Sequence, residues 1–156
     1  MSLISIFAIG VREECFFRAI IQNILAKKYA NTTKGVWLTA IVSALIFGLI
    51  HAFNVFSGVN ALSAIIQAVT NVGLGLFYGA VYLRCKNIWA LISIHALTDT
   101  VGLFASIFTT KSEIEIISTI SWPSLIIGVA FIAISIFLLR PSKCKEIVEG
   151  FKSTNS

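Results

Sequence analysis

The chain has 156 residues, of which 57% are hydrophobic and only 12% are charged. A soluble domain is usually ~45–50% apolar and roughly 25% charged, so this composition excludes an ordinary soluble domain and indicates a membrane protein. The net charge of +5 does not point to nucleic-acid binding, because the basic residues cluster between apolar runs and not on one face.

The three cysteines, Cys15, Cys85 and Cys144, have no paired spacing. They therefore predict neither a disulfide framework nor a thiolate metal site. The chain ends in STNS and carries no prenylation signal of its own. Its apolar start, without a basic region or a cleavage site, gives no indication of a cleavable signal peptide.

Five apolar segments are each long enough to cross a hydrocarbon core, which takes about 20 helical residues. They lie at residues 3–26, 36–54, 60–83, 88–108 and 121–140. Continuous runs of this length satisfy their backbone in lipid only as helices. We therefore expect an all-α, polytopic bundle of about five transmembrane helices in residues 1–140. A polar tail, 141–156, follows as a short helix or a disordered arm.

The basic residues predict how this bundle is oriented. Nine of them fall in the connections and the tail on one side of the membrane: Lys27, Lys28, Lys34, Arg84, Lys86, Arg140, Lys143, Lys145 and Lys152. On the other side stands only Lys111, offset by Glu113 and Glu115. The positive-inside bias then places the C-terminus in the cytoplasm and the N-terminus of this chain outside. We expect an integral protein of a prokaryotic plasma membrane.

The third segment contains GLGLFYG, in which Gly75 and Gly79 form a GxxxG pair. Small residues at this spacing let helix backbones approach closely. We favour contacts within the chain as their purpose; a dimer or a partner chain bound through Gly75 and Gly79 is the alternative.

Seven ionisable residues lie inside the apolar segments: Arg12, Glu13, Glu14, Arg18, His51, His95 and Asp99. A charge at the bilayer centre costs at least ~2.5–3.5 kcal/mol, so such residues are candidates for function. Both histidines of the protein belong to this group. We interpret the group as one shared polar site.

The spacing of these residues suggests which of them have a structural role and which take part in chemistry. Glu14 and Arg18 are four residues apart on one helix face and can form an ion pair, for which we favour a structural role. Glu13 points about 100° away around the helix and is the carboxylate we expect to do chemistry. Asp99 follows His95 by four residues and can accept a hydrogen bond from its imidazole, fixing the tautomer.

Three kinds of chemistry fit these residue types. A carboxylate with imidazoles suits a general base acting on water, with other polar groups stabilising an oxyanion. Two histidines and a glutamate, namely His51, His95 and Glu13, also suit a zinc site with an open position. A transporter's proton relay would use the same residue types. The lack of HExxH weighs against zinc, and the lack of internal repeats weighs against a transporter.

The three motifs EExxxR (Glu13 to Arg18), FxxxH (Phe47 to His51) and HxxxD (His95 to Asp99) occur in order within apolar segments. Together they resemble the motifs of the CAAX-protease and bacteriocin-processing family of intramembrane proteases, also called the CPBP or ABI family. The resemblance covers roughly residues 5–105.

The resemblance implies an intramembrane endopeptidase that works without a covalent intermediate or a cofactor. Glu13 would activate water with help from His51, while His95 and Asp99 would bind the scissile carbonyl oxygen. Glu14 and Arg18 would support them. The substrate would be a membrane-associated peptide or lipidated protein, of the prenylated CAAX or bacteriocin type. A non-catalytic bacteriocin-immunity or scaffold protein of the same shape is the alternative.

The sequence departs from the family pattern at two points. Asp99 stands where the family often has Asn, and a carboxyl group donates a hydrogen bond only when protonated. Family members commonly have further spans before the first motif, whereas Glu13 lies close to the start of this chain. We therefore expect a truncated or minimal form, in which activity either needs a partner chain or is absent.

Overall fold

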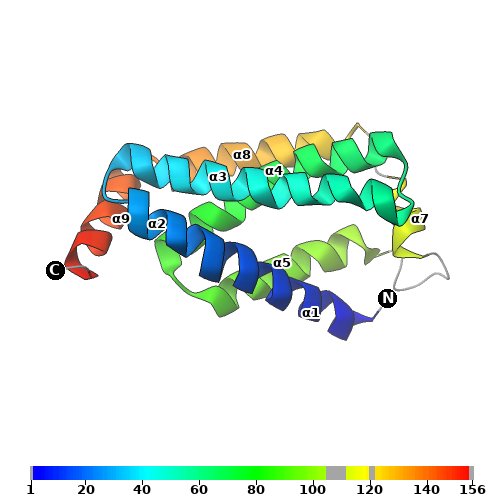
Figure 1. Ribbon diagram of the computed structural model, residues 1–156, viewed down its shortest axis with the longest axis horizontal. Helices are drawn as coiled ribbons and strands as arrows, with labels where there is room; N and C mark the ends of the chain where they lie inside the picture. Colours follow the sequence, from blue (N-terminus) through cyan, green and yellow to red (C-terminus); the bar gives the residue numbers. More distant parts are fainter. Residues whose placement is uncertain (1, 105–111, 120–121, 155–156) are drawn as a thin grey trace.

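The computed structural model describes residues 2–104, 112–119 and 122–154, and all regular structure within them is helical (Figure 1). The all-α prediction is thus confirmed. The elements are α1 (Leu3–Glu14), η1 (Cys15–Gln22), α2 (Asn23–Tyr29), α3 (Thr33–Ala52), η2 (Phe53–Ser57), α4 (Ala61–Cys85), α5 (Ile88–Gly102), α7 (Glu113–Ile117), α8 (Ser124–Leu138) and α9 (Pro141–Thr154).

Polar side chains mark where the central helices begin. Thr32 accepts a hydrogen bond from the backbone N–H of Gly35 at the start of α3, and Asn60 accepts one from Ser63 at the start of α4. Asn87 caps α5 by accepting two backbone N–H groups. Such caps satisfy donors that no preceding helical turn can satisfy. Short polar connections therefore fix where one helix stops and its neighbour returns.

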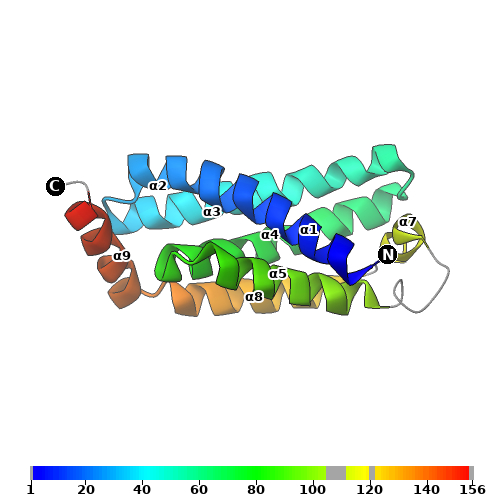
Figure 2. The same ribbon diagram turned by 90° about the horizontal axis from the view of Figure 1, so that it is seen from below.

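The helices form two layers (Figures 1 and 2). Helices α3, α4 and α8 lie side by side, with α4 packed against both of the others. The long N-terminal helix, made of α1, η1 and α2 in direct succession, forms the second layer with α5; in Figure 2 it runs obliquely to α4, while α5 runs along α8. Within that second layer α1 packs on α5, while η1 contacts α3 and α4. Residues 13–18 therefore lie where the two layers meet.

Close helix contacts are possible because small residues face one another. Gly73 of α4 meets Gly128 of α8 so closely that a Cβ atom at Gly73 would lie 2.3 Å from the Gly128 carbonyl oxygen. Alanines and short side chains dominate the largest buried cluster, which comprises Ala26, Ala30, Val36, Ala40, Ala44, Leu76, Ala80, Leu83, Leu139, Cys144 and Ile147.

The C-terminal segment belongs to this same cluster. Of the two forms expected for the tail, the structure has the helix: α9 bends by 65° from α8 and packs on α3 and α4. Cys144 and Ile147 are buried there. The described part of the tail is therefore a docked helix and not a disordered arm.

The described helices differ in whether they are long and apolar enough to cross a membrane. Among the described residues, Thr33–Ser57 and Ala61–Cys85 are long and apolar enough to span a membrane, and α8 with α9 adds a third if the bent pair is one span. Helix α5 is apolar but has only 15 described residues; its predicted continuation to residue 108 and the start of the 121–140 segment lie outside the described residues. The first segment carries four charges at its middle.

Large apolar side chains point outward from the bundle, as lipid-facing residues do. Ile4, Phe56 and Ile126 are each more than 70% exposed. Exposing this much apolar surface to water would be unfavourable, whereas a bilayer core is itself apolar, so such a surface is stable only in lipid. The protein is therefore an integral membrane protein, although the count of five spans stays a prediction.

The basic connections gather at one end of the bundle. The α2–α3 turn, the α4–α5 turn and α9 lie at that end, whereas the N-terminus and α7 lie at the other (Figure 1). This arrangement is the one that the orientation prediction requires.

Replacing Gly73 by Ala should loosen the α4–α8 contact, because the new methyl group meets backbone atoms that cannot rotate away. We expect a loss of about 1–3 kcal/mol in the free energy of unfolding, the usual range for overpacking. Thermal and denaturant unfolding in detergent micelles would measure it. Gly102→Ala is the matched control, since a Cβ there meets nothing within 4 Å. Equal stability of the two variants would contradict the close contact.

Candidate active site

The polar residues of the first motif lie at the junction of α1 and η1. Helix α1 ends at Glu14, and the eight residues of η1, Cys15–Gln22, form a π-helix before α2 continues. π-Helical turns are rare and are frequently found at functional sites. The wider turn begins directly after the two glutamates and contains Arg18.

Glu14 and Arg18 form a fully buried ion pair, as their spacing predicted. Arg18 Nε lies 3.2 Å from Glu14 Oε2, and neither side chain is exposed. Arg18 also donates from Nη2 to the Gly75 carbonyl oxygen at 3.0 Å. Its guanidinium lies 4.5 Å from the ring centroid of Phe47 and 5.5 Å from that of Tyr78. A buried carboxylate is tolerable when it is paired in this way.

The second oxygen of Glu14 binds His95. His95 Nδ1 lies 2.6 Å from Glu14 Oε1, a contact that joins α1 to α5 across 81 residues of sequence. The sequence suggested that Asp99 would orient His95, but the shortest contact to the imidazole comes from Glu14. Asp99 Oδ2 lies 3.4 Å from the other ring nitrogen, Nε2. Glu14 therefore has two buried cationic or hydrogen-donating partners.

The Nε2 side of His95 is the more open side of the cluster. Glu13 Oε2 lies 3.8 Å from Nε2, and the side chains of Glu13 and Asp99 are 17% and 28% exposed. Arg12, which is 75% exposed, lies 3.6 Å from Glu13. Two partly exposed carboxylates thus flank one imidazole nitrogen, while Glu14 and Arg18 are fully buried.

His51 lies apart from these contacts. Its Nδ1 lies 2.8 Å from the Phe47 carbonyl oxygen, a geometry in which Nδ1–H donates and Nε2 is left as an acceptor. Within the described part of the chain it makes no hydrogen bond or ion pair with the other predicted site residues. The Phe47 ring connects it to them, with its centroid 5.0 Å from that of His51 and 5.9 Å from that of His95.

Two aromatic residues, for which no role was predicted, form the walls of the cluster. Tyr78 stacks on His95 with ring centroids 4.8 Å apart, and Phe47 lies between both histidines and Arg18. Phe47 was present in the FxxxH motif and Tyr78 in GLFYG, but an aromatic residue in an apolar helix is most often a core residue. No pattern in the sequence separates the two cases.

The two glycines of the GxxxG pair on α4 accept hydrogen bonds from the N-terminal helix. Arg18 donates to the Gly75 carbonyl, and Gln22, one helical step of four residues later, donates to the Gly79 carbonyl at 2.8 Å. The equal spacing on both helices shows that they run parallel here. Side chains at Gly75 and Gly79 would crowd Phe47 and Gln22 respectively. The glycines are buried inside this chain, and a dimer through them stays an untested alternative.

The positions of the possible ligand side chains bear on the zinc alternative. Among the residues that the structure describes, no three histidine, cysteine, aspartate or glutamate side chains are grouped so that they could hold a metal ion. Zinc in protein sites takes at least three such ligands. The set of His51, His95 and Glu13 stays a prediction.

Comparison with known proteins identifies the family. A model of the type II CAAX prenyl endopeptidase Rce1-like family matches residues 1–101, which is more than half of the chain. The protein belongs to this family, as the three motifs predicted. No curated protein and no solved structure matches the chain. Membership implies a CAAX-type intramembrane protease, and the match includes all three motifs.

Replacing Arg18 by Gln should destabilise the fold strongly, because Glu14 would remain buried with its charge uncompensated. We expect a loss of about 3–5 kcal/mol in the free energy of unfolding, the usual cost of removing one partner of a buried pair. Denaturant titration in detergent would measure this loss.

Arg12→Gln is the control for that experiment, since it removes the same charge from a largely exposed side chain. Its effect should stay within about 0.5 kcal/mol. If Arg18→Gln were as harmless as Arg12→Gln, Glu14 could not be a buried carboxylate that depends on Arg18.

Proposed function

We propose that this protein is an intramembrane endopeptidase that hydrolyses a peptide bond of a prenylated, CAAX-type substrate with a water molecule activated by Glu13. Membership in the CAAX prenyl endopeptidase family supports the reaction class. The observation that carries the mechanism is the position of Glu13, a partly exposed carboxylate beside His95 Nε2 and Asp99.

Glu13 acts as the general base. Of the two adjacent glutamates, Glu14 has both oxygens engaged by Arg18 and His95 and is fully buried. Glu13 keeps an oxygen near the open side of the cluster and can reach a water molecule there. It accepts a proton from that water as the oxygen attacks the scissile carbonyl carbon. The same proton then passes to the leaving nitrogen as the carbon–nitrogen bond breaks, a sequence typical of general acid–base catalysis.

His95 and Asp99 stabilise the negative charge that develops on the carbonyl oxygen. While Nδ1–H donates to Glu14, His95 can also donate from Nε2 only as an imidazolium, since the neutral ring has a single N–H. The carboxylates on either side of the ring are the groups that would favour this form. A fixed donor in a water-poor cavity stabilises an oxyanion far better than bulk water does. Asp99 takes part as a donor only when protonated, and otherwise holds His95.

His51 helps to hold the same water molecule. Because its Nδ1 is committed to the Phe47 carbonyl, Nε2 is available as an acceptor. A water molecule bridging between His51 and Glu13 would be held by two acceptors through its two hydrogens. Such bridging is enthalpically nearly as good as a direct hydrogen bond. The free Nε2 acceptor supports His51 as a positioning residue for the nucleophile.

We also propose how the bundle is oriented in the membrane. The basic end of the bundle faces the cytoplasm of a prokaryotic cell, which places the C-terminus inside. The location of the nine basic residues at one end supports this choice. The bilayer itself and a lipidated peptide are then the partners of this chain.

Glu13→Gln should strongly reduce cleavage, because an amide cannot accept the water proton. We expect the rate of hydrolysis to fall by about 10²–10⁴-fold, the usual contribution of a general base. The assay is the conversion of a prenylated CAAX peptide by the protein in proteoliposomes, followed by mass spectrometry of the products.

Two neighbouring variants control for this loss. Arg12→Gln and Cys15→Ser alter exposed side chains on either side of the glutamates. Both should keep cleavage within a few-fold of the wild type. Full activity in Glu13→Gln would rule out Glu13 as the base, and loss of activity in Cys15→Ser would indicate a thiol nucleophile. No cleavage by the wild-type protein of any peptide tested would favour the non-catalytic immunity or scaffold alternative.

We further propose that the reaction uses no metal ion. The functional groups named above suffice for water activation and oxyanion binding without a Lewis acid. Incubation with 1,10-phenanthroline should therefore leave the cleavage rate unchanged, and metal analysis of active protein should give less than one zinc per ten chains (an order-of-magnitude threshold for a resident ion). Loss of activity that added Zn²⁺ restores would establish the zinc alternative with His51, His95 and Glu13.

A further inference from the structure

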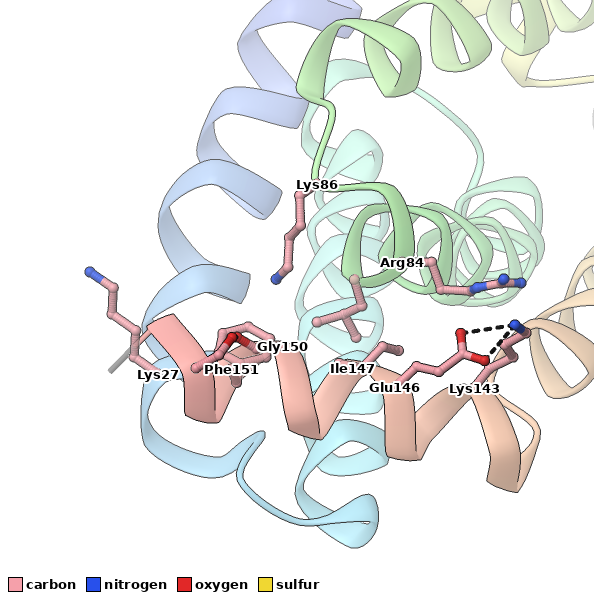
Figure 3. Close-up of a pocket in the computed structure, with 10 residues that line it drawn as sticks. Lys27, Arg84, Lys86, Lys143, Glu146, Ile147, Gly150 and Phe151 are labelled. Atoms are coloured by element: carbon pink, nitrogen blue, oxygen red, sulfur yellow. Dashed lines mark hydrogen bonds and ion pairs between the residues drawn. The ribbon is translucent and has the colours of Figure 1, made fainter. Parts of the chain in front are cut away.

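A second polar feature lies at the basic end of the bundle, away from the cluster described above. Helix α9 folds back under the ends of α2 and α4, and between them lies an open pocket of about 570 Å³ (Figure 3). Its walls come from residues far apart in the sequence: Lys27, Leu83, Arg84, Lys86, Lys143, Glu146, Ile147, Gly150, Phe151 and Ser153.

Positive charge dominates this pocket. Four cationic side chains line it, against one carboxylate. That carboxylate, Glu146, already holds Lys143 through contacts of 2.6 and 2.8 Å to its two oxygens. Lys27, Arg84 and Lys86 also line the pocket, so its cationic side chains outnumber its carboxylate by four to one. In Figure 3 Lys86 extends toward α9, whereas the side chains of Lys27 and Arg84 lie on opposite sides of the pocket and point outward.

Lys86 is held in place more firmly than an ordinary surface lysine. Its backbone has φ 52°, a left-handed conformation that residues other than glycine rarely adopt. Its ammonium lies 3.9 Å from the ring centroid of Phe151 on α9 and 5.6 Å from that of Tyr82. Partial burial lowers the pKa of Lys86 to about 8, so the group is still mostly charged at pH 7. An anion in the pocket would favour its charged form.

The pocket also has an apolar side. Leu83 and Ile147 are buried below it, and Phe151 forms part of its wall. It opens where the apolar helix α4 ends at Cys85, which is where a membrane-spanning helix meets the headgroup layer. Lys27 stands 14 residues beyond Glu13 on the N-terminal helix, about 20 Å along the axis at 1.5 Å per residue. The pocket is thus separate from the candidate active site.

We propose that this pocket binds the phosphodiester headgroup of an anionic phospholipid, with Lys27, Arg84 and Lys86 contacting the phosphate. An anionic lipid matches both the excess of cations and the location at the end of an apolar helix. Basic pockets between membrane helices near the interface are suited to such headgroups. Lipid bound there would fasten α9 to α2 and α4 and so hold together the three segments that form the basic end.

The test uses the full-length protein in detergent and two short-chain lipids with identical acyl chains, phosphatidylglycerol and phosphatidylcholine. Binding is measured by thermophoresis. We expect phosphatidylglycerol to bind at least about tenfold more tightly, since each basic residue near a surface contributes on the order of a fivefold change. Equal affinity for the two lipids would overturn the proposal.

Variants localise the binding. Arg84→Gln combined with Lys86→Gln should weaken phosphatidylglycerol binding about 25-fold, by the same estimate of about fivefold for each of the two charges. The control, Lys145→Gln combined with Lys152→Gln, removes two charges from exposed positions of α9 outside the pocket and should stay within twofold. Equal weakening in the two double variants would mean non-specific attraction and would refute the site.

Three further measurements test the site if the double variant unfolds, distinguish a lipid from free phosphate, and separate lipid binding from catalysis. If the Arg84 and Lys86 double variant unfolds, Lys27→Gln alone should weaken binding about fivefold, and no change there would refute the site. Inorganic phosphate at millimolar concentration should fail to displace the lipid; displacement would identify free phosphate as the ligand instead. Glu13→Gln should bind phosphatidylglycerol as the wild type does, which separates this site from catalysis, and a loss of binding in that variant would contradict their independence.

Discussion

Burial of the Glu14 carboxylate between Arg18 and His95 is the constraint on which the rest of the bundle depends. Taking a carboxylate out of water costs several kcal/mol, and only well-placed partners offset that cost. Arg18 supplies a charge from the same helix, while His95 supplies a donor from α5. The Gly75 carbonyl and the Phe47 ring then hold Arg18 from α4 and α3. One buried carboxylate thus fixes the relative positions of four helices.

That network explains why the helices approach so closely at this level. The parallel donors Arg18 and Gln22 reach the carbonyls of Gly75 and Gly79 because neither glycine has a side chain in the way. A pattern that in other membrane proteins joins two chains therefore serves contacts within this one. The π-helical segment η1 lies at the same place, with the wider turn carrying Arg18 toward α4. Because Arg18 and His95 hold Glu14 in the interior, the next residue around the helix, Glu13, lies on the more open side.

Local spacing was enough to predict part of this site from sequence. Four-residue spacing within a helix predicted the Glu14–Arg18 pair, and the three motifs predicted the family. Contacts between helices could not be predicted in the same way: Glu14 and His95 are 81 residues apart, and nothing in HALTD distinguishes a histidine held by Asp99 from one held by Glu14. Hydropathy likewise detected apolar runs, but the bending of α8 into α9 and the docking of the tail depend on tertiary contacts.

The distribution of charge follows from one physical rule, and the exceptions to it locate the chemistry. A bilayer leaves two stable places for an ionisable side chain, a buried pair within the protein or the interface at a helix end. Glu14 and Arg18 occupy the first, and the nine basic residues of the connections and tail occupy the second. Glu13 and Asp99 fit neither, since they lie inside apolar segments, partly exposed, and share the Nε2 side of one histidine. Folding alone does not explain the free-energy cost of placing them there, whereas the proposed activation of water beside His95 requires two such groups.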